Sequence, residues 1–312
     1  MEKPYNHISV LLNESIQQLN IKKNGVYVDC TLGGGGHSSE ILKRIPNGHL
    51  YAFDQDSFAI NTADEKLKKI ASNYTLINEN FVNIKVALEE ENVHGVDGIL
   101  YDLGVSSFQL DIPERGFSYR FDGPLDMRMD QTAELDAYTV VNTYDEKSLV
   151  RILFEYGEEK FARLIARKIV SEREKKPIET TLELVEIIKK ALPASALRNS
   201  SHPAKQTFQA IRIEVNNEIE PLYNTVINAI DSLKSGGRLC IITFHSLEDR
   251  AVKDAYKDSV GKCTCPPDLP YCVCGNKSKG KIKTKKPILP TEEEMKINSR
   301  SKSAKLRIFE KN

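Results

Sequence analysis

The stretch Val26-Tyr-Val-Asp-Cys-Thr-Leu-Gly-Gly-Gly-Gly-His37 carries the strongest fold signal in the chain. A short apolar run ends in Asp29, four glycines follow, and Ser38-Ser-Glu-Ile-Leu-Lys43 has the pattern of the start of a helix. Glycines between a strand and a helix let the backbone approach a ligand closely. A second apolar run, 49–53, is followed by Asp54, where an acid commonly holds a nucleoside ribose. The stretch therefore predicts a parallel α/β sheet with a nucleoside site at its strand ends.

The spacing of the glycines narrows the choice of nucleoside. A dinucleotide fingerprint needs a third glycine, but counting from Gly33 or Gly34 this position falls on Ser38 or Ser39. The phosphate loop of nucleotide hydrolases needs Gly-Lys-Ser/Thr, which the sequence lacks. We therefore expect a nucleoside without a pyrophosphate, and S-adenosylmethionine, with its adenosine and charged amino-acid tail, fits. The alternative is a glycine-rich turn that binds no ligand.

Composition and charge are those of an ordinary globular protein. The 312 residues are 40% hydrophobic and 28% charged, and 44 Lys and Arg balance 44 Asp and Glu. Any basic surface for nucleic acid must therefore be local. The N-terminal residues lack an apolar signal region, and no run approaches membrane-spanning length. Six cysteines without a secretory signal predict reduced thiols in a cytoplasmic protein with no membrane partner.

Strand and helix patterns alternate as far as Asp102. The predicted elements are a strand at 26–29, a strand at 49–53, a helix at 57–70, a strand at 74–77, a helix at 81–90 and a strand at 98–102. Repeated strand–helix units with short connections favour a parallel sheet covered by helices on both faces.

The alternation then stops until the predicted strand at 238–244, which follows the turn at 235–237. The intervening pattern is mostly helical, at 146–154, 158–174, 182–192 and 216–233. We predict a discontinuous domain of residues 1–106 and 213–312, with an inserted helical substrate-recognition domain at 107–212. Because ligands bind at strand carboxyl ends in such sheets, the insert would cover the site. A last strand at 304–309 is expected at the sheet edge.

Asp102 begins the segment Asp102-Leu-Gly-Val-Ser-Ser107, beside the expected cofactor site. For transfer of a methyl group, the protein must mainly position a nucleophile behind the S–CH₃ bond and stabilise charge. The exocyclic amine of a nucleobase is a weak nucleophile because its lone pair is delocalised into the ring. A carboxylate and backbone carbonyls that accept its hydrogens would draw the nitrogen toward tetrahedral geometry. Asp102 is therefore the candidate catalytic residue, and the alternative is that it caps the following turn.

Four segments of the chain are long and unusual. They are Asp102-Leu-Gly-Val-Ser-Ser, Glu114-Arg-Gly-Phe-Ser-Tyr-Arg-Phe-Asp-Gly-Pro-Leu-Asp-Met-Arg-Met-Asp130, His202-Pro-Ala-Lys-Gln-Thr-Phe-Gln-Ala-Ile-Arg212 and Gly236-Gly-Arg-Leu-Cys-Ile-Ile-Thr-Phe-His-Ser-Leu-Glu-Asp-Arg250. Together they resemble the bacterial small-subunit (16S) ribosomal RNA cytosine-N4 methyltransferases, and the likeness runs from Asn6 to Arg307. The resemblance implies a class I methyltransferase (Rossmann-like) fold with an inserted helical domain. It also implies S-adenosylmethionine as cofactor and transfer of its methyl group to the N4 amine of one cytidine in the decoding region.

The resemblance also assigns site residues and partners. The implied cofactor residues are Gly34, Gly35, Gly36 and His37 in the loop, Asp54 at the ribose, Phe81 at the adenine, and Asp102 and Gln109 completing the pocket. The implied partner is 16S rRNA or the small ribosomal subunit, and a homodimer is plausible. The sequence departs from the family pattern at Phe108, where relatives usually have proline, and at Gln206, where an arginine is usual.

Two regions of the chain are candidates for RNA contact. One interleaves arginines with aromatic residues, a mixture that suits phosphate neutralisation with base stacking: Arg115, Phe117, Tyr119, Arg120, Phe121 and Arg128. The alternative is a solvated loop whose aromatic rings fill the core of the insert. The lysine-rich segment 277–286 is either an RNA-phosphate arm or a solubilising linker.

Two further patterns lie near the C-terminus. Ser246 with Asp249 predicts a cap for the helix after the fifth strand, beside His245, which is either a strand-end residue or a pocket wall. Four cysteines in a proline-rich loop are candidate ligands of a structural zinc, although Cys-x-Cys pairs are a weaker signal than Cys-x-x-Cys: Cys263, Cys265, Cys272 and Cys274. The alternative for this loop is free thiols.

The sequence leaves open a function of another class. The chain is either an enzyme, as above, or a non-catalytic RNA-binding or ribosome-assembly factor with a vestigial cofactor pocket. A nucleotide-dependent oxidoreductase is disfavoured by the glycine spacing.

Overall fold

A computed structural model describes residues 9–198, 202–261, 265–266, 269–271 and 277–312. The chain divides into two compact units. The first contains the residues up to Gly104 together with Ile219–Asn312, and the second contains Val105–Glu218. The second unit is longer than the predicted insert at 107–212 because the last helix packed in its core, α11 (Lys205–Asn216), continues past residue 212.

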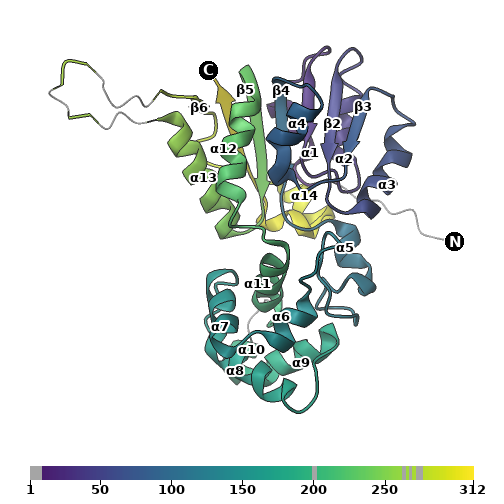
Figure 1. Ribbon diagram of the computed structural model, residues 1–312, viewed down its shortest axis with the longest axis vertical. Helices are drawn as coiled ribbons and strands as arrows, with labels where there is room; N and C mark the ends of the chain where they lie inside the picture. Colours follow the sequence, from purple (N-terminus) through teal and green to yellow (C-terminus); the bar gives the residue numbers. More distant parts are fainter. Residues whose placement is uncertain (1–8, 199–201, 262–264, 267–268, 272–276) are drawn as a thin grey trace. The chain divides into compact units, whose positions relative to one another are not determined.

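The first unit is built on a seven-stranded sheet with the order β3-β2-β1-β4-β5-β7-β6 (Figure 1). The strands are β1 (Val26–Asp29), β2 (His49–Phe53), β3 (Tyr74–Ile77), β4 (Val96–Asp102), β5 (Leu233–Thr243), β6 (Gly280–Ile282) and β7 (Lys305–Lys311). Strands β1 to β5 pair in parallel, whereas β7 is antiparallel to both β5 and β6. This parallel-dominated sheet has the class I methyltransferase (Rossmann-like) architecture that the sequence predicted.

Helices cover both faces of this sheet, as its apolar strands require. They are α1 (Leu12–Gln18), α2 (Gly36–Leu42), α3 (Ser57–Leu67), α4 (Ile84–Glu90) after the 3₁₀ turn η1 (Phe81–Asn83), α12 (Leu222–Ser232) and α13 (Ser246–Val260). Helix α14 (Glu292–Ile297), which has no buried residues, and η3 (Ser299–Ser303) lie between β6 and β7 in the chain. Side chains alternate between two cores along each strand. In β4, Ile99 and Tyr101 join the core that contains residues of α4, α12 and α13, whereas Leu100 joins the core that contains residues of α1, α2 and α3.

Strand β5 differs from the prediction at its start. It begins at Leu233 rather than at residue 238, and Leu233 pairs with Val96 while Arg238 pairs with Gly98. The residues between these pairs therefore form a bulge, in which Gly236 has a φ angle of 74°. The predicted turn at 235–237 is thus part of a β-bulge within β5.

The predicted helix at 216–233 is also interrupted. Helix α11 ends at Asn216, and α12 begins only at Leu222. Asn217 has a φ angle of 47°, the left-handed conformation that commonly ends a helix and that asparagine tolerates. Pro221 then precedes α12. The remaining shifts in element ends are small, because terminal turns carry little sequence signal.

The second unit is mostly helical and has a core of its own. Besides α11, it contains α5 (Ser107–Asp111), η2 (Pro113–Arg115), α6 (Ala137–Thr143), α7 (Glu146–Glu155), α8 (Ala162–Arg173), α9 (Thr181–Ala191) and α10 (Ala194–Leu197). The apolar faces of α6 to α9 and α11 bury a common set of side chains, including Val140, Leu149, Ile165, Ile188 and Ile211. The predicted helices at 146–154, 158–174 and 182–192 correspond to α7, α8 and α9. Over the described ranges, no helix is long and apolar enough to cross a membrane.

Candidate functional site

The loop between β1 and α2 needs glycine for two separate reasons. Gly33 and Gly35 have φ angles of 47° and 67°, in the left-handed region that residues with a Cβ adopt only at a cost. Gly36 is crowded instead, because a Cβ there would overlap the hydroxyl oxygen of Ser9. The backbone of this loop therefore follows a path that larger residues would disturb.

Asp54, which directly follows β2, and Lys66 of α3 both hold this loop. The N–H of Gly33 donates to Oδ2 of Asp54 (2.8 Å), and the Nζ of Lys66 donates to the carbonyl oxygen of Gly34 (3.1 Å). The second carboxylate oxygen of Asp54 accepts the N–H of Asp56 (2.9 Å). The structure thus brings the predicted ribose acid and the glycine loop together.

Burial controls the ionisation of Asp54. It raises the pKa of Asp54 to about 6, although the two backbone N–H groups at its oxygens favour the charged form and lower the pKa. Above pH 6 the carboxylate is mainly ionised and can accept hydrogen bonds from hydroxyl groups.

Phe81 lies close to the same strand ends. Its ring meets that of Tyr101 in β4 edge-on, with the ring centroids 5.3 Å apart. Asn80, immediately before Phe81, donates its side-chain N–H to Oε1 of Gln55 (2.8 Å), the residue after Asp54. Phe81 is partly exposed, so one part of the ring remains available to a flat ligand near Asp54.

Asp102 ends β4 and faces the start of α2. Its N–H donates to Oγ1 of Thr31 (2.6 Å), and its Oδ2 lies 3.7 Å from Nδ1 of His37. The Asp102 side chain is 21% exposed, whereas His37 is 4% exposed. Oδ1 of Asp102 is buried and has no hydrogen-bond partner within the described part of the chain. A buried acceptor atom of this kind is costly unless a ligand satisfies it.

Other acids surround Asp102 and raise its pKa. Burial has the largest effect, and the charges of Asp29, Glu248 and Glu294 add to it, so that the pKa of Asp102 is well above its usual range. Asp29 is fully buried and accepts the hydroxyl of Ser38 (2.6 Å). This concentration of negative charge favours a ligand that carries positive charge and opposes a pyrophosphate.

Glu248 and Glu294, which also act on Asp102, were not predicted from the sequence. Glu294 lies on α14 and accepts the N–H of Leu11 (2.7 Å), a contact between the two ends of the chain. No local pattern distinguishes these glutamates from surface acids, because only the fold brings them near Asp102.

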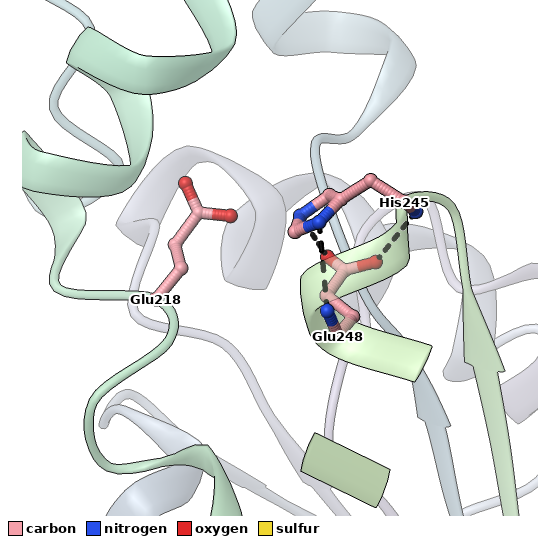
Figure 2. Close-up of side chains that lie close together, drawn as sticks. All are labelled: Glu218, His245 and Glu248. Atoms are coloured by element: carbon pink, nitrogen blue, oxygen red, sulfur yellow. Dashed lines mark hydrogen bonds and ion pairs between the residues drawn. The ribbon is translucent and has the colours of Figure 1, made fainter. Parts of the chain in front are cut away.

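The predicted cap of α13 is wrong in its residues. The N-cap is His245 rather than Ser246, and its partner is Glu248 rather than Asp249 (Figure 2). Glu248 Oε2 accepts the N–H groups of Phe244 (2.7 Å) and His245 (3.2 Å), and Oε1 lies 3.0 Å from Nε2 of His245. The prediction failed because histidine is an unusual cap, whereas serine is a common one.

Two other acids, Asp249 and Glu218, each pair with an arginine. Asp249 forms a buried, two-contact ion pair with Arg307 of β7, with Nε–Oδ1 and Nη2–Oδ2 distances of 2.5 and 3.2 Å. Glu218, also drawn in Figure 2, is the last residue of the second unit and pairs with Arg212 (Nε–Oε1 2.8 Å).

Gln109 belongs to the second unit. It lies on α5, where its Oε1 accepts the N–H of Ser106 (2.9 Å) and its own N–H donates to the Ser106 hydroxyl (3.3 Å). This reciprocal capping box fixes the start of α5, with Phe108 as the second residue of the helix. The role of Gln109 in the cofactor pocket stays a prediction.

Two of the arginines proposed for RNA contact are engaged within the second unit. Arg115 is buried, and its Nη2 donates to the carbonyl oxygens of Arg128 (2.9 Å) and Met129 (3.2 Å). Arg128 pairs with Asp126 through Nη2 (2.7 Å) and Nε (3.1 Å). Phe117 is buried in the core of the unit, as the alternative interpretation of this loop held. Tyr119, Arg120 and Phe121 remain at least partly exposed.

The lysine-rich segment is partly folded and partly neutralised. Lys281 lies on β6 and pairs with Glu310 of β7 (2.8 Å), as does Lys283 (3.3 Å). Lys279 pairs with Asp231 of α12 (2.7 Å). Lysines on a short edge strand also discourage pairing with other chains. This part of the segment therefore has a structural explanation that does not require RNA.

The zinc prediction falls mostly on residues that the structure does not describe. Cys263, Cys272 and Cys274 lie outside the described residues, and Cys265 is partly exposed. A zinc site in this loop stays a prediction.

Comparison with known proteins gives a consistent result over nearly the whole chain. The model of the MraW methylase family matches residues 4–312. A protein of Clostridium botulinum (strain Kyoto / Type A2), named ribosomal RNA small subunit methyltransferase H, is 58% identical over 308 residues, which are 98% of this chain and 99% of that protein. Proteins of the same name from Clostridioides difficile (strain 630) and Brevibacillus brevis are 56% and 54% identical, each over 98% of this chain and over 99% and 98% of their own lengths.

Proposed function

The chain belongs to the MraW methylase family, and we propose that it transfers a methyl group from S-adenosylmethionine to the exocyclic N4 amine of a cytidine in the decoding region of 16S rRNA. The observation that carries this proposal is the site at the ends of β1, β2 and β4, where the glycine loop, Asp54 and Asp102 meet. The names of the relatives support small-subunit rRNA as the substrate. The N4 position, cytoplasmic localisation and a homodimer are further predictions from the sequence.

The residues of the site fit S-adenosylmethionine. Asp54 would accept the ribose hydroxyls, and Phe81 would pack against the adenine. The acids around Asp102 suit a cofactor whose sulfonium and ammonium groups carry positive charge. The buried, unpartnered Oδ1 of Asp102 also requires a donor or a cation. When bound, the cofactor supplies an electrophilic methyl group.

Asp102 would position the amine that receives the methyl group. The positive charge of the bound cofactor would favour the ionised form of Asp102, whose pKa is raised in the free protein. As a carboxylate, Asp102 would accept a hydrogen of the amine, which turns the nitrogen lone pair out of conjugation with the ring and toward the donor. Its N–H is held by Thr31, so the carboxylate has a fixed place at the end of β4. A fixed, charged acceptor is worth more here than in water because it needs no reorganisation. After transfer the nitrogen is strongly acidic, so no strong base is required.

Transfer of labelled methyl to small ribosomal subunits that lack the modification tests the proposed function. We expect the purified full chain to label 16S rRNA, and nuclease digestion with mass analysis to place the methyl on N4 of one cytidine. Subunits from cells that already carry the modification are the control. Calorimetric binding of S-adenosylmethionine without any methyl transfer would contradict the enzyme assignment and favour the RNA-binding or assembly factor.

The affinity for the cofactor should depend on pH through Asp54. Its pKa is about 6 in the free protein, and only the ionised carboxylate offers acceptors to both ribose hydroxyls. Affinity should therefore fall as the pH drops below 6, by up to about tenfold per pH unit, because binding must then release a proton. The contribution is fully present only well above pH 6, where the free protein already has Asp54 ionised. Calorimetry between pH 5 and 7 measures the effect, and a constant affinity over that range would contradict the assignment of Asp54.

A further inference from the structure

The second unit carries a stacked pair of aromatic rings at its surface. The ring of Tyr119 lies on that of His202, with the centroids 4.3 Å apart and the planes 15° from parallel. Tyr119 also meets Phe208 edge-on at 5.8 Å, and Phe208 is buried on α11 in the core of the unit. The pair therefore rests on a rigid support while both of its members stay partly exposed.

His202 is held as a neutral ring. The N–H of Ala204 donates to its Nδ1 (3.3 Å), which places the ring proton on Nε2. Burial lowers the pKa of His202, and the positive charges of Lys189 and Arg120 lower it further. A neutral, flat imidazole stacked on tyrosine can pack against another aromatic face without losing the hydration of a charge.

Cations and a further aromatic ring lie around this pair. Arg120 and Phe121 follow Tyr119 in the chain and are exposed. Lys205 is exposed at the start of α11, and its N–H donates to the carbonyl oxygen of His202 (3.0 Å). Lys189 lies on α9, where its Nζ is 2.7 Å from Glu186 at the surface, a pair that contributes little to stability and exchanges readily.

We propose that these side chains bind single-stranded RNA. The aromatic–basic surface consists of Tyr119, Arg120, Phe121, Lys189, His202 and Lys205. A base would stack on the Tyr119–His202 pair, and the cations would contact the neighbouring phosphates, which is how proteins commonly hold unpaired nucleotides. The inference rests on the proposed function in that rRNA is the substrate. An acidic peptide would use the cations but would gain nothing from the stacked rings, so RNA is favoured.

Binding of a fluorescein-labelled, single-stranded RNA oligonucleotide to the full chain, measured by anisotropy, tests the surface. His202→Ala should weaken binding about 5-fold or more, because stacking of one base is worth about 1–3 kcal/mol. His202→Phe should retain affinity within about twofold, since it keeps a flat ring. Arg120→Ala should weaken binding and reduce the slope of log affinity against log salt by about 1. Arg167→Ala is the matched control, an exposed arginine of the same unit whose charge faces Glu146 at 3.8 Å.

The outcomes separate this surface from the proposed function. Wild-type affinity in both His202→Ala and Arg120→Ala, or no binding of RNA by the unmodified chain, would overturn the surface. Weaker binding in Arg120→Ala alone, with polyglutamate competing as well as RNA, would indicate a simple polyanion site and also overturn it. Methyl transfer to 16S rRNA by the unmodified chain decides the proposed function independently. Cofactor binding by each variant, measured by calorimetry, verifies that the first unit is intact.

Discussion

Replacing Asp54 with alanine is expected to lower the affinity for S-adenosylmethionine at least about 100-fold. A carboxylate that accepts two ribose hydroxyls makes two charge-assisted hydrogen bonds of about 1.5–3 kcal/mol each, and every 1.4 kcal/mol is a factor of about ten. The substitution also removes the acceptor of the Gly33 N–H, so the glycine loop loses its contact with the residue that follows β2. Titration calorimetry at pH 7.5 gives the dissociation constant directly.

Two variants make this result specific. Asp54→Asn keeps an oxygen for the Gly33 N–H but loses the charge, and an intermediate loss of about tenfold is expected. Glu65→Ala changes an exposed acid on α3 and should bind the cofactor like the unmodified chain. Unchanged affinity in Asp54→Ala would show that the ribose does not lie at this strand end.

The second large effect is expected from Asp102→Asn, which should slow methyl transfer by about 10²–10³-fold, the cost of removing one fixed electrostatic contact at a reacting centre. Asparagine has the size of aspartate, but it lacks the charge and presents an N–H₂ group that repels the hydrogens of the amine. Single-turnover transfer to small subunits at saturating cofactor measures this step apart from binding. Asp102→Ala should also weaken cofactor binding, because Oδ2 of Asp102 lies 3.7 Å from Nδ1 of His37, next to the glycine loop proposed to hold the cofactor.

A control acid distinguishes a role in catalysis from a general loss of charge. Glu89→Gln alters an exposed residue of α4, and its transfer rate should equal that of the unmodified chain. If Asp102→Asn retained more than about a tenth of the rate, Asp102 would not orient the amine.

The parallel part of the sheet could be predicted from the sequence because its strands are apolar runs, and β1, β2 and β4 end at or just before an acid. Asp54, the glycine loop and Asp102 follow from the same pattern, since carboxyl ends of parallel strands meet at one edge. The bulge in β5 could not be predicted, because it depends on pairing with residues of β4 that are distant in the chain. The same reason hid Glu294, whose partner Leu11 lies at the other end of the sequence.

Charge patterns were a weaker guide than apolar patterns. Arg115 and Arg120 lie only five positions apart in the sequence, yet Arg115 is buried against backbone carbonyls while Arg120 is exposed. The sequence shows how many cationic residues a segment has, but not which of them form hydrogen bonds or ion pairs within the folded protein. His202 shows the converse, because its stacking on Tyr119 joins two segments that are far apart in the chain.

The pairing of β4 has a consequence for synthesis of the chain on the ribosome. β4 lies between β1 and β5, but β5 begins only at Leu233, after the whole second unit. At roughly 5–20 residues per second, a nascent chain presents β4 with one flank unpaired for on the order of ten seconds, while the helices of the second unit, which have their own core, can already fold. The pairing of β4, which bears Asp102, is thus completed late. A chain that is cut short before β5 would leave one edge of β4 without its partner strand.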